Sequence, residues 1–395
     1  MTRSSPPRSA TAPSSARDPS SRSGAARDTP RWEASRIRAF RRALLAHFGK
    51  SQRDLPWRGI ADPYAILVSE FMLQQTRVAT VIPYFHRWME RFPTAEHLAE
   101  GEPEAVLRTW EGLGYYSRAR NLQRAAQEIV ASHAGRVPRD PEALQRLPGV
   151  GPYTAGAVAS IAFDVPVPAV DGNVRRVLSR LADLPRPSVA AQQRWAASLV
   201  DPQSPGDFNQ ALMELGAILC TPRSPACDAC PVQSFCAAHR AGTQEDRPLR
   251  AAARRIPSLR EAVVALVRED AESRWLLLRR RPEEGLLAGM WEFPGVTVPD
   301  GGDPEEAARQ LTDRLICRLC QSGPTPGRAA VTRLDDLVHM FTHRRVQYIP
   351  FLIRLGKGPP PRLANSSLKW VKRGTEGSLP LPVAQRTLWA RIDAG

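Results

Sequence analysis

The spacing of hydrophobic residues changes along the chain, and the change predicts two parts of different architecture. In residues 31–240, apolar side chains recur every three or four positions, as on one face of a helix. A first helix shows this spacing in Ile37, Phe40, Leu44 and Phe48. In residues 259–392, short apolar runs typical of strands appear at residues 262–267, 275–278 and 346–353. The sequence therefore predicts an all-α part followed by an α+β part.

Two of the predicted helices are joined by the turn Pro148-Gly149-Val150-Gly151. Its two glycines can take backbone angles closed to other residues, and Pro152 suits the first position of the second helix. Bare N–H groups at such a helix start can bind a phosphate oxygen, which holds DNA without reading its sequence. The turn by itself is equally compatible with a plain helix–helix connection.

Two carboxylates stand out from the pattern around this turn. Asp171 precedes a predicted helix that begins at Asn173, so it suits the N-cap, where the ionised form is favoured. It could also face whatever the hairpin holds. Glu70 lies on the helix that Asp62-Pro63 opens, beside an apolar face, where burial would raise its pKa and keep it protonated near neutrality. Alternatively, Glu70 lies at the edge of the apolar stripe and extends to water.

A turn loosened by glycines, Gly112-Leu113-Gly114, precedes two aromatic residues, Tyr115 and Tyr116. Aromatic side chains on a flexible loop can stack on bases or wedge between them. Tyrosines of the protein core would give the same sequence, so the loop alone leaves both alternatives open.

Four cysteines have the spacing Cys-x6-Cys-x2-Cys-x5-Cys, namely Cys220, Cys227, Cys230 and Cys236. Four thiolates in so short a span can surround one metal centre, either zinc or an iron–sulfur cluster. Zinc ribbons usually have two Cys-x2-Cys pairs, whereas this segment has one, so the wider gaps favour a [4Fe-4S] cluster. The other pair, Cys317 and Cys320, lies in a helical pattern and is predicted to consist of plain buried thiols.

The chain has 395 residues and a formal net charge of +15, which is typical of proteins that bind a polyanion such as nucleic acid. No apolar run reaches membrane-spanning length, and the N-terminus lacks the apolar core of a signal peptide. We therefore expect no membrane contact and a cytoplasmic location, where cysteines serve as ligands or free thiols. Residues 1–30 are predicted to be a disordered basic tail, and residues 241–258 a connector.

These motifs together resemble the helix-hairpin-helix DNA glycosylases and, within them, the MutY family of adenine glycosylases. The resemblance begins at about Arg36 and runs to the C-terminus. It rests on the four cysteines and on residues 55–58, 69–76, 112–116, 147–154 and 170–174. It implies an all-α helix-hairpin-helix glycosylase core with an iron–sulfur cluster loop at residues 31–240, followed by an α+β Nudix-like domain at residues 259–392.

The resemblance also implies roles for individual residues in removing an adenine that has left the base stack. Glu70 would protonate adenine N7, and Asp171 would stabilise the sugar cation, much as two carboxyls do in glycoside hydrolysis. Tyr153 and Asn173 would support these groups. The adenine pocket would be lined by Arg53, Trp57, Arg58, Leu73 and Glu214. DNA would be contacted by Gln75 and Tyr115 near the opposing base, and by Gly149 and Gly151 at the hairpin.

One position distinguishes this chain from relatives similar to endonuclease III. Those relatives carry in the hairpin a lysine that forms a Schiff base with the sugar and then cuts the strand. This chain has Tyr153 at the matching position. The resemblance therefore implies that the base is removed and the backbone is left whole.

Residues 291–295 resemble the entry to a Nudix box, but the acidic residues of the box are altered. In the matching residues 309–314, Gln310 and Arg314 replace two glutamates and Asp313 replaces a third. A Mg²⁺ site needs that negative charge, so hydrolysis is predicted to be lost. The segment Phe341-Thr342-His343 matches the loop with which the family contacts 8-oxoguanine, and Thr342 keeps the hydroxyl of the serine often found there.

The sequence therefore predicts a monofunctional adenine DNA glycosylase of base excision repair with a [4Fe-4S] cluster. It would act as a monomer on double-stranded DNA with adenine opposite 8-oxoguanine or guanine, and DNA would hold it at the nucleoid. One alternative is another glycosylase of the superfamily, such as one that removes mismatched thymine, against which Glu70 and the C-terminal domain argue. The others are a nucleotide-pool hydrolase, disfavoured by the altered Nudix acids, and a non-catalytic DNA-binding protein, disfavoured by the paired Glu70 and Asp171.

Overall fold

The computed structural model of the chain describes residues 29–60, 62–249, 256–319, 330–361, 363 and 367–394. Nearly all of the predicted N-terminal tail, residues 250–255 of the predicted connector, and Cys320 lie outside the described residues. Contacts divide the chain into two compact units. The first comprises Met1–Ser51, Val170–Asp201 and Gln210–Arg250, and the second comprises Gln52–Ala169, Pro202–Asn209 and Ala251–Gly395.

The first unit is helical. Its elements are α1 (Ala34–Ser51), α9 (Gly172–Leu181), α10 (Val189–Leu199), most of α11 (Pro205–Ile218) and α12 (Ala237–Ala241). The predicted apolar face of α1 is confirmed, since Phe40, Leu44 and Phe48 are buried. Phe40 packs edge-on against Phe235, with ring centroids 5.6 Å apart. The first helix is thereby fixed to the segment that carries the four spaced cysteines.

The N-terminal half of the second unit is also helical. Its helices are α2 (Pro63–Leu73), α3 (Val78–Arg91), α4 (Ala95–Ala99), α5 (Pro103–Trp110), α6 (Ser117–His133), α7 (Pro141–Arg146) and α8 (Pro152–Phe163). As predicted, Asp62 caps α2 by accepting a 2.9 Å hydrogen bond from the Tyr64 N–H, with Pro63 in the first turn. None of the described helices is both long and apolar enough to cross a membrane.

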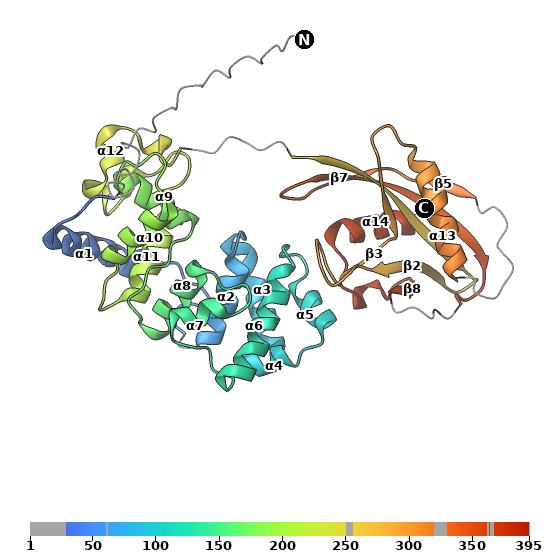
Figure 1. Ribbon diagram of the computed structural model, residues 1–395, viewed down its shortest axis with the longest axis horizontal. Helices are drawn as coiled ribbons and strands as arrows, with labels where there is room; N and C mark the ends of the chain where they lie inside the picture. The colour runs from blue at the N-terminus through green and yellow to red at the C-terminus, as the bar shows by residue number, and fades with distance from the viewer. Residues whose placement is uncertain are drawn as a thin grey trace, which may run out of the picture. The chain divides into compact units, whose positions relative to one another are not determined.

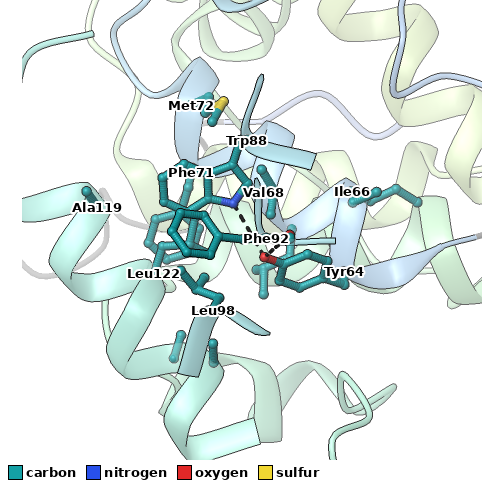
Figure 2. Packing of buried hydrophobic residues seen from close by; sticks show 14 of the residues in the cluster. Tyr64, Ile66, Val68, Phe71, Met72, Trp88, Phe92, Leu98, Ala119 and Leu122 are labelled. Atoms are coloured by element: carbon teal, nitrogen blue, oxygen red, sulfur yellow. Dashed lines mark hydrogen bonds between the residues drawn. The ribbon is translucent and has the colours of Figure 1, made fainter. Parts of the chain in front are cut away.

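Helix α2 is the centre of this half, because every residue from Tyr64 to Met72 is buried. Figure 2 shows aromatic side chains packed around it. The Tyr64 hydroxyl donates to the Phe92 carbonyl (3.0 Å) and accepts from the Trp88 indole N–H (3.4 Å), so the polar atoms of the buried rings are paired. A helix buried on all sides forces any carboxyl it carries into the core.

The C-terminal half of the second unit contains an eight-stranded sheet. Its strands are β1 (Ser258–Glu269), β2 (Arg274–Arg280), β3 (Trp291–Glu292), β4 (Gly295–Val298), β5 (Val331–Arg333), β6 (Leu337–Met340), β7 (Arg345–Lys357) and β8 (Leu368–Lys372). The main order is β3-β2-β1-β7-β5, with β4, β6 and β8 paired to β1, β7 and β2. The central pair β1–β7 is parallel and the other pairs are antiparallel. All three predicted strands are present.

Each face of this sheet is covered by a helix, α13 (Pro304–Leu319) on one and α14 (Val383–Ala394) on the other. Alternate residues of β1 supply the two cores: Val263 and Ala265 join Leu388 of α14, whereas Val264 and Leu266 join Leu315 of α13. Figure 1 shows both helices with the sheet. The predicted α+β architecture is therefore confirmed.

The prediction that Cys317 is buried is wrong, because Cys317 lies exposed on α13.

Candidate functional site

The buried Glu70 and the half-buried Tyr153 form a hydrogen-bonded pair where α2 packs against α8. The Glu70 side chain is 4 % exposed, and the Tyr153 hydroxyl donates a 2.6 Å hydrogen bond to its Oε2. The alternative in which Glu70 extends to water is thus wrong. Burial on all sides of α2 overrides the tendency of a glutamate to reach the surface, and the tyrosine supplies the polar partner that a buried carboxyl needs.

The hairpin between α7 and α8 has the predicted shape but uses its glycines differently from the prediction. Gly149 has φ +79°, and a Cβ there would lie 2.6 Å from Asn121 Cβ and 3.0 Å from Phe71 Cε1. Gly149 is therefore required by both backbone and space. Gly151 has an ordinary φ of −92°, so the expectation of a special backbone angle there is wrong.

Gly151 instead leaves open the approach to the N-terminus of α8. It is the N-cap of α8, no side chain caps the helix, and a Cβ built on Gly151 would meet nothing within 4 Å. N–H groups at an open helix start favour an anionic ligand because the helix dipole adds to their partial charges.

Asp171 is the N-cap of α9, as predicted, and both of its carboxyl oxygens are held. Oδ1 accepts a 2.7 Å hydrogen bond from the Val174 N–H, and Oδ2 accepts a 2.9 Å bond from Asn173 Nδ2. Burial raises the pKa of Asp171 above its ordinary value, and these two hydrogen bonds oppose the rise by favouring the ionised form. The cap therefore limits the effect of burial without reversing it.

A chain of hydrogen bonds continues from Asp171 to the cysteine segment. Asn173 Oδ1 accepts a 2.9 Å bond from Arg176 Nη2, and Arg176 Nε donates to the Cys220 carbonyl at 2.8 Å. Arg180, which is 2 % exposed, donates from Nη1 to Cys220 Sγ at 3.1 Å. Asp171 and Asn173 thus share one rigid network with the first of the four cysteines.

The residues predicted to line an adenine pocket are placed as follows. Arg53, Trp57 and Arg58 belong to one turn, in which Arg58 Nη1 donates to the Arg53 carbonyl at 2.7 Å. Trp57 is buried and packs edge-on against Phe85, with ring centroids 5.4 Å apart. Leu73, the last residue of α2, packs partly buried against the helical core. Glu214 is buried in α11, within a segment of the first unit.

Gln75 and Tyr115 lie on two loops with strained backbone. Gln75 has φ 58° and Tyr115 has φ 48°, backbone angles that residues other than glycine rarely adopt. Tyr115 is 41 % exposed, whereas Tyr116 is buried, so the two alternatives for the aromatic loop each hold for one tyrosine. Strain held in exposed loops is typical of segments that meet a ligand.

Arg118 fixes these two loops to each other, a role that was not predicted from the sequence. It is 6 % exposed and lies at the start of α6. Its guanidinium donates to the carbonyls of Phe71, Met72, Gln74, Leu113 and Gly114 and to the Thr76 hydroxyl, at 2.5 to 3.1 Å. Burial lowers the pKa of Arg118 to about 10. The available signal in the sequence was an arginine two residues after the pair of tyrosines.

Within the second unit, the predicted lesion-contact loop meets the aromatic loop. The hydroxyls of Tyr115 and Thr342 are in contact. A cavity of about 350 Å³ lies between the two loops and is lined by Gly112, Tyr115, Phe341, Thr342 and His343 among others. Phe341 packs on His339, with ring centroids 4.6 Å apart, and His343 Nε2 accepts a 3.0 Å bond from Arg344 Nε. The two segments that the sequence assigned to the opposing base are therefore brought together.

The four spaced cysteines lie in a loop built from two single-turn 3-10 helices, Cys227–Ala229 and Gln233–Phe235. Among the residues that the structure describes, no group of three His, Cys, Asp or Glu side chains is arranged to hold a metal ion. The donor set itself fits an iron–sulfur cluster, because it offers four thiols and a buried arginine that stabilises a thiolate. As a free thiol, Cys230 has a pKa raised to about 11 by burial, so a positive centre is needed to keep it a thiolate at neutral pH.

Comparison with known proteins gives matches over most of the chain. Residues 68–199 match the HhH-GPD superfamily base excision DNA repair protein, residues 220–236 the iron-sulfur binding domain of endonuclease III, and residues 262–391 the NUDIX domain. The chain is 40% identical to the adenine DNA glycosylase of Rattus norvegicus, over 85% of this chain and 74% of that protein. It is 38% identical to that of Homo sapiens, over 86% of this chain and 71% of that protein. A solved structure of a thermostable thymine-DNA glycosylase is 30% identical, with a TM-score of 0.49 over 52% of this chain and 98% of that chain.

Proposed function

Because this chain belongs to the adenine DNA glycosylases, we propose that it removes adenine opposite 8-oxoguanine or guanine and leaves the DNA backbone whole. The enzyme is a DNA N-glycosylase of base excision repair and carries a [4Fe-4S] cluster. We propose, beyond this, the choice of mispair, the absence of strand cleavage, action as a monomer and the roles of individual residues.

The observation that carries the proposal is the 2.6 Å hydrogen bond from the Tyr153 hydroxyl to Glu70 Oε2. In the proposed mechanism, Tyr153 holds Oε2, and a protonated Glu70 delivers its proton from Oε1 to adenine N7. Protonation of N7 draws the electron pair of the C1′–N9 bond toward the base, so that adenine leaves as a neutral molecule. A buried carboxyl is suited to this because a site that excludes water favours its neutral form.

Asp171 would stabilise the positive charge that develops on the sugar as the bond breaks. Both of its oxygens are fixed by donors, so the carboxylate is aimed without further reorganisation. Water then adds to C1′ and gives its proton to the Glu70 carboxylate left by the first step, which completes the hydrolysis and restores the acid. This division of labour, with one neutral carboxyl and one ionised carboxylate, is that of glycoside hydrolysis.

Strand cleavage in this superfamily needs an amine at the sugar, and here a phenol occupies the place of the lysine. Tyr153 cannot form a Schiff base, because that step requires a nitrogen nucleophile that condenses with the sugar aldehyde. Its hydroxyl is in addition engaged with Glu70. The product should therefore be an intact strand with an abasic site.

Binding of the [4Fe-4S] cluster to the four cysteine thiolates would order the loop to which Arg176 and Arg180 are hydrogen-bonded. The residues that would hold it are Cys220, Cys227, Cys230 and Cys236. The cysteine loop would affect the active site only by positioning Asp171. Arg176 bonds Asn173, and Asn173 in turn bonds Asp171.

The proposal is tested with an end-labelled duplex that carries adenine opposite 8-oxoguanine. The enzyme should yield strands that break only after hot alkali, and borohydride should trap no more covalent adduct than a reaction without enzyme. A Tyr153→Lys variant supplies the matched comparison, because it restores an amine at the same place. Efficient breakage by the native enzyme without alkali would refute the monofunctional assignment.

A further inference from the structure

An ion pair joins the two halves of the second unit at the start of the aromatic loop, residues 112–116. Arg386 of α14 donates from Nη2 to Glu111 Oε2 at 2.7 Å and from Nε to Glu111 Oε1. The two residues lie 275 positions apart in sequence. A guanidinium that holds both oxygens of one carboxylate fixes the orientation of the two side chains as well as their distance. The pair therefore sets how the two segments that carry it lie relative to each other.

The Glu111–Arg386 pair is more shielded than most ion pairs at a protein surface, which contribute little because water surrounds them. The Glu111 side chain is 15 % exposed, and Arg386 Nη2 also donates to the Leu379 carbonyl at 3.4 Å. Partial burial reduces the screening by water, so the attraction between the two charges is stronger than in open solvent. We therefore expect the loss of either partner to have a measurable effect.

On the helical side, the pair holds the residue from which the aromatic loop starts. Glu111 is the C-cap of α5, and Gly112 follows with φ +102°. A Cβ at Gly112 would collide with the Tyr84 hydroxyl, so only glycine fits this bend. The bend leads to Tyr115, whose backbone is strained at φ 48°. The Glu111 carboxylate thus fixes the start of the loop that presents Tyr115.

On the other side, the pair holds the helix that supports the lesion-contact loop, Phe341-Thr342-His343. Val383, the first residue of α14, lines the cavity of about 350 Å³ together with that loop, and Arg386 follows one helical turn later. Phe341 packs against the core that α14 covers. Farther along α14, Arg391 Nη1 donates to the Asp336 carbonyl at 2.8 Å, directly before β6. Helix α14 is therefore attached at both ends of the strand that leads to the lesion-contact loop.

We propose that Glu111 and Arg386 are positioning residues that set the preference for adenine opposite 8-oxoguanine over adenine opposite guanine. This inference rests on the proposed function, in which Tyr115 and the lesion-contact loop contact the opposing base. The hydroxyls of Tyr115 and Thr342 are in contact, so a small shift between the two loops changes what both present to that base. A recognition site must be held to within about 0.5 Å of its productive geometry. Neither Glu111 nor Arg386 is among the described residues that line the cavity, so both act through the loops.

A second bond between the same two halves provides a matched comparison. The Trp291 indole N–H of β3 donates to Glu104 Oε1 at 3.1 Å, in the first turn of α5. Glu104 and Glu111 thus lie at opposite ends of one short helix, and each accepts a bond from the C-terminal half. Among the described residues that line the cavity, neither Trp291 nor Glu104 is found. Loss of this bond tests whether attachment of the two halves is sufficient by itself.

The test is single-turnover excision, by the full-length protein, of adenine opposite 8-oxoguanine and opposite guanine. We expect Glu111→Ala and Arg386→Gln each to lose about fivefold of the native preference, at the upper end for a partly exposed ion pair. The loss should come mainly from slower excision opposite 8-oxoguanine. The double variant should lose no more than either single variant, because the two residues act as one unit. Arg386→Lys keeps the charge but not the two-pronged geometry, so its preference should lie between those of the native enzyme and Arg386→Gln.

The control is Glu104→Ala, which should keep the native preference, and a thermal melt shows that each variant is folded. A loss in Glu104→Ala equal to that in Glu111→Ala overturns the inference, as do losses that add up in the double variant. An unchanged preference in Glu111→Ala and Arg386→Gln, beside a native enzyme that discriminates, refutes this inference and leaves the proposed function standing. A native enzyme that acts on both duplexes at equal rates refutes the proposed choice of mispair, and this inference with it.

Discussion

The Tyr153 hydroxyl donates a 2.6 Å hydrogen bond to Glu70 Oε2 from the first turn of α8 to the middle of α2. The bond joins the hairpin, which is open to an anion at its N–H groups, to the carboxyl proposed as the acid. The proposed phosphate contact at the hairpin and the proposed proton delivery by Glu70 therefore depend on the same pair of packed helices.

Substitution of Glu70 should slow excision more than substitution of Tyr153. Glu70→Gln keeps the shape of the side chain but removes the proton, so excision should fall by at least ~10²-fold. Tyr153→Phe removes only the positioning bond, and we expect a loss of about tenfold, consistent with one hydrogen bond to a charged or polar partner. Single-turnover excision measures both, and gel-shift binding of the duplex should be kept in each. A Glu70→Gln enzyme with native turnover would exclude Glu70 from the mechanism.

The pKa of Asp171 predicts how excision depends on pH. In the proposed mechanism Asp171 must be ionised to stabilise the sugar cation, so excision should fall as pH drops through its pKa, which burial has raised. The Asn173 amide lowers that pKa by bonding the ionised form. Asn173→Ala should therefore raise the pKa further and move the acid limb of the pH–rate profile to higher pH.

The control for this shift is Arg175→Ala on the same helix, whose side chain bonds Gln192 rather than the carboxyl. Its acid limb should coincide with that of the native enzyme. A profile for Asn173→Ala with an unmoved acid limb and only a lower plateau would mean that Asn173 acts on structure alone.

Arg118 should matter to both stability and DNA contact. Arg118→Met leaves several buried carbonyls without donors, which should lower the free energy of unfolding by about 3 kcal/mol or more. The loops that carry Gln75 and Tyr115 would also lose their common anchor, so duplex affinity should fall. Urea denaturation and binding titrations measure the two effects. Arg124→Met, an exposed arginine of the same helix, is the control and should change neither; equal effects would leave Arg118 no special role.

The cysteine loop yields a prediction that separates ligand thiols from other thiols. Purified protein should be brown and contain about four irons per chain, as a cubane cluster requires. Cys230→Ser should lose the colour and lower the yield of folded protein, since cluster binding and folding are coupled. Cys317→Ser, at an exposed thiol of α13, should keep both. One zinc per chain and no colour would contradict the assignment.

Features that depend on neighbouring residues in sequence were predictable. Asp62 and Asp171 were recognised as caps because a cap bonds N–H groups two or three positions away, and both bonds are present. The strands of the second half were recognisable because alternate residues of β1 face two different cores.

Features that depend on tertiary contacts were not. The role of Arg118 arises only when the end of α2 and the aromatic loop meet around its guanidinium. The need for glycine at position 149, beyond its backbone angle, comes from Asn121 and Phe71, which are distant in sequence. Likewise, the periodicity of apolar residues predicts that Cys317 lies on a helix, but it does not predict that Cys317 is exposed to solvent.

The most direct test of the account is single-turnover excision of adenine opposite 8-oxoguanine and opposite guanine, for the native protein and for Thr342→Ala/His343→Ala. The native enzyme should favour the 8-oxoguanine duplex, because Thr342 and His343 lie beside Tyr115 on the cavity assigned to the opposing base. The double variant should keep excision opposite guanine and lose about tenfold of the preference, the size expected for a contact to a base edge. Equal rates on the two duplexes for the native enzyme, or an undiminished preference in the double variant, would contradict the account.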